Sequence, residues 1–511
     1  MPDPPAAPPT TVAIVTLGCG RNEVDSENAA GLLTSAGYRV VADPEQADAV
    51  IVNTCAFVEA AKRESIETVL DAAALKEQGR ARTVLVTGCL AERYTEELRV
   101  ELPEADAIVP FADYARLPEL LGGHRWARPN GSGDGAGPVV PGAALIPPGA
   151  ALIPPGVAPA PPSTGPGRSS LVPVGRRALP MVFPTPAGAA FPARAAARGP
   201  VALVKLAEGC DRDCSFCAIP SFRGRFRSRR PTEILDEVAW LAGQGVTEIC
   251  LVAENSTSYG KDLGGREALI HLLRDLAEVD GLRRVRLNYL QPDELTPGLL
   301  EEMAANPVVC SYFDLSLQHA SAPVLRRMRR GGSAEGFLEL VGRIRALDPD
   351  AAFRSNFILG FPGERAADVR RLEAFLEAAR LDWVAFFAWS PEDGTAALAL
   401  DGRVAPGVAR SRVERVQEVQ DRVVAEAQQG WVGRRLEVLV ERVEDDGTAE
   451  GRSFREAPES DGVVRVEGEP RPVRRGPGNP EGVPRPVRVG EYVTVEITAA
   501  QGPELLARLA G

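Results

Sequence analysis

Short apolar runs alternate with helical stretches between Thr11 and Trp126. The runs TVAIVTLG, AVIVNT and TVLVTG are rich in β-branched residues, and each is followed by a segment with the pattern of a helix, such as SENAAGLLTSAGY after the first. Apolar strands that each precede a helix are typical of a parallel sheet covered on both faces. We therefore predict a doubly wound α/β domain over residues 11–126, preceded by a disordered tail of residues 1–10.

A second series of apolar runs begins near Val201 and contains six strand candidates. They are VALVKLAEG, TEICLVAEN, RRVRLNYLQ, YFDLSLQHA, AFRSNFILGF and DWVAFFAWS. The segments between them, such as PTEILDEVAWLAGQG, carry apolar residues at three- and four-residue spacing, which indicates helices. Six strand–helix units in series predict a partial (βα)6 barrel, in which functional residues lie at the carboxyl ends of the strands. With a polar connecting helix near 410–429, this domain is predicted to span residues 200–430.

Two further segments differ in composition from these domains. Residues 127–199 are dominated by Gly, Pro and Ala, and the run PGAALIPPGAALIPPG contains GAALIPP twice in tandem. Such a segment cannot bury enough surface to offset its ordering entropy, so a flexible linker is expected. From Trp431 onward, strand-like runs are separated by Gly- and Pro-rich turns. This predicts a small β-barrel over residues 431–501, followed by a tail of residues 502–511.

Charge and composition narrow the classes of function. A net charge of −12 argues against broad, non-specific binding to nucleic acid. No apolar run reaches about eighteen residues, and MPDPPAAPPT at the N-terminus lacks the features of a secretory signal. We therefore expect a cytoplasmic protein without a membrane partner, in which metal binding is favoured over disulfides. The basic stretch RGRFRSRRP is either a solvated loop or a surface for a ribosome, RNA or another anionic partner.

Three of the eight cysteines lie together in the stretch AEGCDRDCSFCAIP. Cys210, Cys214 and Cys217 follow the first strand of the second series with the spacing C-x3-C-x2-C. A four-iron cluster is normally held by four cysteine thiolates, so three ligands on one loop would leave one iron open for chemistry. Zinc would prefer a fourth Cys or His nearby, and none lies close in the sequence. The loop therefore predicts a reactive iron–sulfur cluster.

This loop, with Phe216 just before its third cysteine, resembles the cluster motif of the radical S-adenosylmethionine enzymes. The resemblance implies that the open iron binds S-adenosylmethionine, which one electron cleaves to methionine and a 5′-deoxyadenosyl radical. The partial barrel is also the fold that this family implies. Glu254, at the end of the second barrel strand, matches the position that contacts the methionine moiety, and FILGFPGE, with Gly360, resembles the adenosine-binding strand end. His319, at another strand end, is a candidate for lining the barrel cavity.

Three other cysteines occupy equivalent places in the N-terminal domain. Cys19, Cys55 and Cys89 each come just after a predicted parallel strand. Ligand sites in such sheets form outside the carboxyl ends of the strands, so the three thiols are expected to converge. The alternative is three buried, inert cysteines, which the repeated placement disfavours. We predict a second iron–sulfur site with three ligands, and assign Cys250 and Cys310, in or beside apolar strands, to the core.

Two three-cysteine sets, on a doubly wound domain and on a radical barrel, followed by a β-rich tail, resemble the methylthiotransferases. In that family the first set would hold an auxiliary cluster, so that the enzyme carries two 4Fe–4S clusters, and the tail would be a substrate-recognising TRAM domain. The resemblance implies transfer of an –SCH3 group to an unactivated C–H bond. One S-adenosylmethionine donates the methyl group and a second supplies the radical. A low-potential electron donor such as flavodoxin or ferredoxin is also implied.

Members of the family modify either the β-carbon of an aspartate in a small-subunit ribosomal protein or a tRNA adenosine, which becomes 2-methylthioadenosine. The stretches LGCGRNEVDSE, SLQHAS and GRSFREAPESDG resemble motifs of the protein-modifying branch, although Gly20 and Arg21 stand where Pro-Lys is usual. From Trp431 to Ala500 the chain has eleven Arg and no Lys against fourteen Asp and Glu, whereas a tail that grips tRNA should be basic. This favours a ribosomal protein as substrate, with tRNA as the alternative. A scaffold protein with zinc on both sets is a further alternative, which predicts colourless protein without S-adenosylmethionine cleavage.

Overall fold

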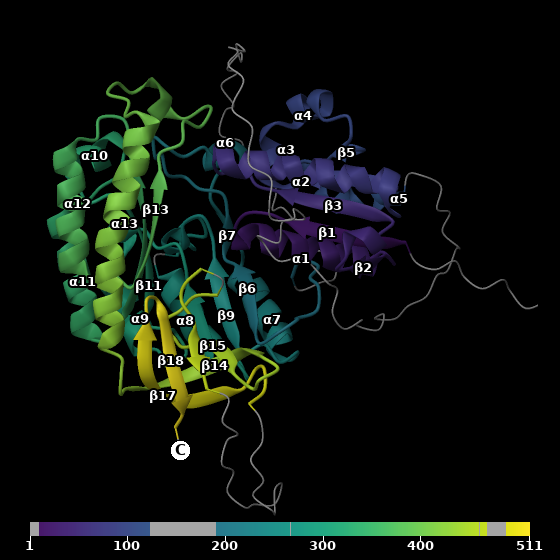
Figure 1. Ribbon diagram of the computed structural model, residues 1–511. Coiled ribbons are helices and arrows are strands. Elements are labelled where there is room, and N and C mark those ends of the chain that lie inside the picture. The colour runs from purple at the N-terminus through teal and green to yellow at the C-terminus, as the bar shows by residue number, and fades with distance from the viewer. Residues whose placement is uncertain (1–9, 123–190, 266, 459, 468–486, 511) are drawn as a thin grey trace, which may run out of the picture.

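The structure of the protein, a computed structural model, describes residues 10–122, 191–265, 267–458, 460–467 and 487–510. Figure 1 shows an α/β domain in purple and blue, a barrel in teal and green beside it, and a small β domain in yellow below the barrel. Residues 1–9 of the predicted tail and 127–190 of the predicted linker lie outside the described residues. Within the described part of the chain, no helix combines the length and apolar character needed to cross a membrane.

The N-terminal domain is a five-stranded sheet in the order β2-β1-β3-β4-β5, and all its strand pairings are parallel. The strands are β1 (Thr11–Thr16), β2 (Arg39–Val41), β3 (Ala49–Thr54), β4 (Thr83–Thr87) and β5 (Ala107–Ile108). β1 and β3 are buried along their whole length, because helices cover both faces of the sheet. The strand order reverses between β1 and β3, where doubly wound sheets bind ligands. The predicted doubly wound fold is confirmed.

Helices follow the long strands of this sheet. They are α1 (Gly20–Ser35), α2 (Glu59–Gln78), α3 (Gly88–Arg93), α4 (Thr95–Glu101) and α5 (Leu117–Gly122), with 3₁₀ turns at Pro44–Gln46 and Phe111–Arg116. Cys19 has extended backbone angles, φ −102° and ψ 167°, and is the N-cap of α1. The connection from β1 to α1 is therefore short, and it holds Cys19 at the carboxyl edge of the sheet.

The central domain has six parallel strands in the order β6-β9-β10-β11-β12-β13, with β10 and β11 joined by isolated bridges. The strands are β6 (Val201–Lys205), β9 (Glu248–Val252), β10 (Arg284–Leu287), β11 (Tyr312–Gln318), β12 (Ala352–Leu359) and β13 (Trp383–Ala388). Among the described residues nothing pairs β13 with β6, so the barrel is open on that side. The predicted partial barrel is confirmed. α1 contacts β6, and a Cβ added to Gly20 would lie 2.9 Å from Cδ1 of Leu203.

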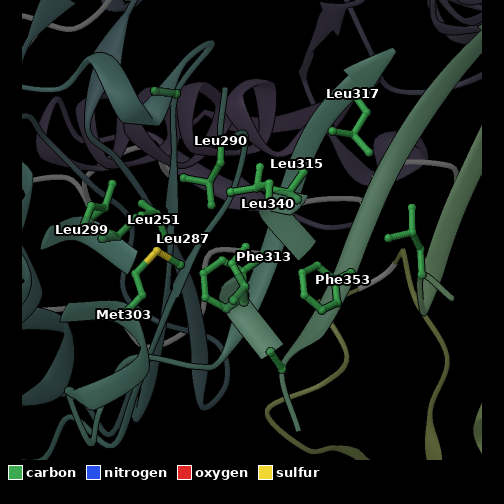
Figure 2. Close-up of a cluster of buried hydrophobic side chains, with 14 of the residues drawn as sticks. Leu251, Leu287, Leu290, Leu299, Met303, Phe313, Leu315, Leu317, Leu340 and Phe353 are labelled. Atoms are coloured by element: carbon green, nitrogen blue, oxygen red, sulfur yellow. The ribbon is translucent and has the colours of Figure 1, made fainter. Parts of the chain in front are cut away.

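Helices and a short ribbon surround the barrel. The helices are α6 (Ile219–Phe222), α7 (Pro231–Ala242), α8 (Ala268–Ala277), α9 (Pro297–Ala305), α10 (Ala322–Arg327), α11 (Ala334–Leu347), α12 (Ala366–Ala379) and α13 (Pro406–Gln429), with 3₁₀ turns at Ser256–Ser258, Pro292–Glu294 and Ala396–Ala399, and the ribbon pairs β7 (Ala207–Glu208) with β8 (Arg227–Ser228). In Figure 2, apolar side chains from neighbouring strands gather with Leu299 and Met303 of α9 in one buried cluster. Phe313 and Phe353 stack there with ring centroids 5.9 Å apart. This packing fixes the strands whose ends carry the site.

The C-terminal domain is a closed barrel in the order β14-β15-β16-β18-β17. Its strands are β14 (Arg435–Val443), β15 (Ala449–Arg452), β16 (Val464–Val466), β17 (Tyr492–Gln501) and β18 (Glu504–Leu509). The sequence prediction ended this domain at residue 501 and assigned residues 502–511 to a tail. That tail contains β18, so the predicted end of the domain is too early. Leu505 and Ala507 of β18 are buried in the barrel, so the strand is needed to close the sheet.

A buried charge network joins this small barrel to the central domain. Glu248, fully buried at the start of β9, lies 3.0 Å from Arg452 and 3.3 Å from Arg286. Burial alone would raise the pKa of Glu248, but Arg452, Arg286 and Arg284 hold it down at about 2. Arg286 also donates to the carbonyl oxygen of Phe454 at 2.8 Å. The stretch GRSFREAPESDG thus lies at the junction of the two domains.

The end of the predicted linker is also packed. Arg194 is 8% exposed and forms ion pairs with Glu27 of α1 and Glu237 of α7. The backbone N–H of Ala195 donates to the carbonyl oxygen of Glu27 at 3.0 Å. Residues 191–199 therefore connect the N-terminal domain to the central barrel beside β6, whose first residue is Val201.

Candidate active site

The first set of thiols lies at the carboxyl edge of the N-terminal sheet, as the sequence predicted. Cys19 follows β1, Cys55 follows β3, and Cys89 lies in the first turn of α3 after β4. Gly18 has φ +94°, and a Cβ there would lie 2.9 Å from Sγ of Cys55, so only glycine lets the first loop approach the second. The structure thus brings three cysteines from distant parts of the sequence to one edge.

The thiols of this set influence one another electrostatically. Burial raises the pKa of Cys55 to about 12, and the neighbouring Cys89 and Cys19 add to the shift. Burial would also raise the pKa of Cys19, but Arg21 and Arg223 lower it below its usual value. A thiolate at Cys19 is therefore stabilised by two guanidinium groups, and thiolates are the form that ligates metals.

Arg223 is a site residue that the sequence prediction did not identify. It is 4% exposed and donates to Sγ of Cys89 at 3.3 Å, to Oδ1 of Asn22 at 2.8 Å and to Oδ2 of Asp25 at 3.0 Å. It also donates to Glu208 at 3.1 Å. In the sequence, Arg223 is the first residue of the basic stretch that we interpreted as a solvated loop or an anion-binding surface. In the structure, it is buried beside the first thiol set.

The second set of thiols lies on the loop between β7 and α6. Gly209 has φ +73° and turns the chain directly before Cys210, whose N–H donates to the carbonyl oxygen of Gly224 at 3.1 Å. The N–H of Cys217 donates to the carbonyl oxygen of Cys214 at 3.1 Å, which closes the loop. Burial raises the pKa of Cys210 to about 11 and that of Cys217 to about 12. Binding of a metal would therefore release protons from these thiols.

Arg21 and Glu254 lie between the two sets. Nε of Arg21 is 3.5 Å from Oε1 of Glu254, and its guanidinium lies 5.2 Å from the ring centroid of Tyr289. The charge of Arg21 lowers the pKa of Cys19 and acts in the same direction on Cys217, although burial dominates at Cys217. Arg21 is therefore close to both thiol sets.

The carboxylate oxygens of Glu254 could accept hydrogen bonds from a ligand. It is 9% exposed, and neither oxygen of its carboxylate has a hydrogen-bond partner among the described residues. Burial raises its pKa, although Arg21 opposes the shift. A buried carboxylate without donors is costly, and a bound ammonium group would satisfy it. The methionine moiety that the sequence resemblance places at Glu254 carries such an ammonium group.

The other predicted contacts of S-adenosylmethionine lie on the same side of the barrel. The ring of Phe216 packs against Phe361 with centroids 6.5 Å apart, and Phe361 directly follows Gly360. Gly360 has φ +74°, and its N–H donates to Glu364 at 2.9 Å. His319 is fully buried rather than lining the cavity, because its Nδ1 accepts two backbone N–H groups at 2.9 Å.

The donors of the two sets are cysteine thiols, the ligands that iron–sulfur clusters take. In the part of the chain that the structure describes, no three Cys, His, Asp or Glu side chains could share one metal ion. A four-iron cluster separates its ligating sulfurs more widely than one ion does, and it takes thiolate ligands. Each set supplies three thiols, so a four-iron cluster bound there would have one iron without a protein ligand. Cys250 and Cys310 are 0% and 3% exposed and belong to the core, as predicted.

A cavity of about 710 Å³ opens beside the first set. It is lined by Gly18, Cys19, Gly20, Glu23, Glu64, Val201, Ala202, Leu203, Val252, Asn288, Tyr289, Asp314, Arg354, Asn356, Glu441, Ala457, Pro458 and Ser460. All three domains contribute to it, since these residues come from the loop after β1 with α1 and α2, from strands of the central barrel, and from the C-terminal domain. A substrate in this cavity would contact Cys19 directly.

Comparison with protein families divides the chain in the same way as the structure. Residues 11–110 match a family described as uncharacterized protein family UPF0004, residues 204–376 match the radical SAM superfamily, and residues 432–509 match the TRAM domain. The chain therefore contains a radical SAM domain, and this superfamily implies S-adenosylmethionine and a 4Fe–4S cluster as cofactors. The TRAM match includes β18.

Named relatives match the chain over almost its whole length. The ribosomal protein uS12 methylthiotransferase RimO of a Nocardioides species is 45% identical over 98% of this chain and 97% of the relative. The protein of that name from Salinispora arenicola is 46% identical over 97% and 94%. Among solved structures, the radical S-adenosylmethionine methyltransferase TsrM of Kitasatospora setae is 17% identical, with a TM-score of 0.46 over 74% of this chain and 72% of that one.

Proposed function

Since the chain belongs to the family of ribosomal protein uS12 methylthiotransferases, RimO, we propose that it transfers an –SCH3 group to the β-carbon of an aspartate in ribosomal protein uS12. The observation that carries this proposal is the match to relatives of that name over nearly the full chain, with both cysteine sets at one site. The acidic composition of the C-terminal domain supports a basic ribosomal protein as partner over tRNA.

The two thiol sets have separate roles in this proposal. Cys210, Cys214 and Cys217 hold the 4Fe–4S cluster to which S-adenosylmethionine binds. Cys19, Cys55 and Cys89 would hold an auxiliary 4Fe–4S cluster. When bound, these groups supply the electron, the hydrogen-abstracting radical and the methylated sulfur that the reaction requires. A low-potential donor of the flavodoxin or ferredoxin class is proposed as the source of the electron.

The residues between the two thiol sets are proposed to bind and orient S-adenosylmethionine. Glu254 accepts hydrogen bonds from the amino group of S-adenosylmethionine, and Arg21 holds the Glu254 carboxylate at 3.5 Å. Phe216, packed on Phe361, and the backbone at Gly360 would contact other parts of S-adenosylmethionine. Glu254 and Phe361 are buried, which would help to shield a reactive carbon radical there from water.

Mass spectrometry of a strain that lacks this gene, compared with its parent, tests the proposal. We expect intact uS12 of the parent to carry a thiomethyl increment at an aspartate and uS12 of the deletion strain to lack it. Digested tRNA nucleosides from the same two strains serve as the control and should not differ. Loss of a thiomethylated adenosine, with uS12 unchanged, would replace the proposed substrate with tRNA.

A further inference from the structure

The cavity beside Cys19 has an uneven distribution of charge. Three carboxylate residues of its lining, Glu23, Glu64 and Glu441, come from the N-terminal and C-terminal domains, and Asp314 comes from the barrel. Among the described residues that line it, Arg354 is the only cation. A ligand with a carboxylate would be repelled by most of this lining, and Arg354 is the one group that compensates a buried negative charge.

Arg354 is held in place by the C-terminal domain. Its Nη1 lies 3.3 Å from Oδ1 of Asp461 and donates to Oγ of Ser460. Asp461 is fixed in turn, because its Oδ2 accepts from Tyr312 at 2.7 Å and from the N–H of Ala457 at 2.8 Å. The Arg354 side chain lines the cavity and remains 22% exposed. A guanidinium has five N–H donors, so these partners leave donors for a ligand.

Asp314 lies directly beside Arg354 and has an unused oxygen. The two residues are partners in the register of β11 and β12. Asp314 is 3% exposed, its Oδ2 accepts the N–H of Tyr289 at 2.9 Å, and its Oδ1 has no hydrogen-bond partner in the described structure. Burial raises the pKa of Asp314, although Arg354 and the N–H of Tyr289 oppose the shift. In its protonated form, Asp314 could donate a hydrogen bond from the unpaired oxygen to an incoming carboxylate.

We propose that Arg354, assisted by Asp314, binds the side-chain carboxylate of the target aspartate. This inference rests on the proposed function and assigns the residues that recognise its substrate. A guanidinium that holds both oxygens of a carboxylate also fixes the adjacent β-carbon, which is the carbon to be modified. Cys19 lines the same cavity, so the bound aspartate faces the first thiol set. The acidic residues Glu23 and Glu64 at the edge then favour basic residues next to the target.

The test compares binding of two forms of uS12 to the reconstituted full-length enzyme. One form has the target aspartate, and the other has asparagine there, at the position located by mass spectrometry. We expect the wild type to bind the aspartate form on the order of tenfold or more tightly than the asparagine form, measured by anaerobic fluorescence anisotropy. In Arg354→Gln this preference should disappear. Arg354→Lys should retain part of it, because the charge remains but the two-pronged geometry is lost.

A matched control separates recognition from domain docking. Arg283 is an exposed arginine at the same junction, outside the cavity, and pairs with Glu437 at 2.9 Å. Arg283→Gln should keep the preference for aspartate. Iron content and melting temperature establish that each variant is folded, and if Arg354→Gln fails to fold, Arg354→Lys carries the test.

Each remaining outcome has a distinct meaning. If Arg354→Gln binds both forms more weakly but still prefers aspartate, Arg354 only ties the C-terminal domain to the barrel and the inference is wrong. Equal binding of both forms by the wild type would contradict it as well. If the wild type neither binds nor modifies uS12, the proposed function itself fails.

Discussion

Cys210, Cys214 and Cys217 lie on one short loop, whereas Cys19, Cys55 and Cys89 come from three strand ends that are far apart in the sequence. The loop set is shaped by local turns such as the one at Gly209. The distributed set depends on the whole parallel sheet. It also depends on Arg223, which the central domain supplies six residues after Cys217 and which donates to Cys89.

The two thiol sets share a segment of the chain and are therefore not independent. The stretch from Cys210 to Arg223 shapes the second set at its beginning and supports the first set at its end. Ala218, Ile219 and Phe222, between them, pack against the core of the N-terminal domain. A disturbance of this segment should therefore reach both sets, while a disturbance of the sheet should reach only the first.

The largest effects are expected when the thiols are removed. Replacing Cys210, Cys214 or Cys217 by Ala should abolish cleavage of S-adenosylmethionine, because a cluster with two protein ligands is not held. Replacing a thiol of the first set should preserve cleavage but stop formation of thiomethylated uS12. Chromatography of 5′-deoxyadenosine and mass spectrometry of uS12 measure the two outcomes. Thiomethylated product from Cys19→Ala, Cys55→Ala or Cys89→Ala would refute the two-cluster scheme.

Loss of Arg223 should affect the first thiol set, Cys19, Cys55 and Cys89, more than the second. Arg223→Gln removes one of the two buried cations that pair with Asp25 and Glu208, leaving Lys205 as the other, and it removes the donor to Cys89. We expect about four fewer iron atoms per chain after reconstitution, since one cluster is lost. Arg225→Gln is the matched control, because Arg225 is exposed and pairs with Asp211 at the surface. Normal iron content in Arg223→Gln would show that the sheet alone assembles the first set.

A smaller effect is expected at Glu254, between the two sets. Glu254→Gln keeps the shape of the side chain but removes the charge that would bind an ammonium group. We expect the affinity for S-adenosylmethionine to fall about tenfold or more, measured by equilibrium binding to the reconstituted enzyme. The iron content should stay at the wild-type value, because Glu254 is no cluster ligand in this scheme. Unchanged affinity would remove Glu254 from the binding site.

The smallest effect concerns the junction with the C-terminal domain. Glu248 has a folded-state pKa of about 2, below the unfolded value of about 4.3, so its stabilising contribution is present above the unfolded pKa and is lost as pH falls toward 2. Glu248→Gln should lower the free energy of unfolding near neutral pH by about 3 kcal/mol and should flatten its decrease below pH 5. Melting temperatures between pH 7 and 3 test this. Glu437→Gln, at an exposed ion pair of the same junction, should follow the wild type.

The sequence by itself determined the fold class and both cysteine sets. Continuous apolar runs specify buried parallel strands wherever helices follow them, because such strands have few other ways to bury both faces. C-x3-C-x2-C is visible because its residues are local. Cys19, Cys55 and Cys89 were predictable because all parallel strands end at one edge of their sheet.

Only the tertiary structure decided which charged residues serve the site. Arg223 and Arg354 have no periodic pattern in the sequence, and their roles come from partners such as Asp25, Asp314 and Asp461 that are distant in the chain. The same holds for β18, because the Gly502-Pro503 turn before it is visible in the sequence but its pairing with β16 and β17 is not. Burial strengthens the electrostatic interactions of these residues, because the local dielectric constant is lower than in water. Whether a residue is buried depends on the packing of the whole molecule, and no local stretch of sequence specifies it.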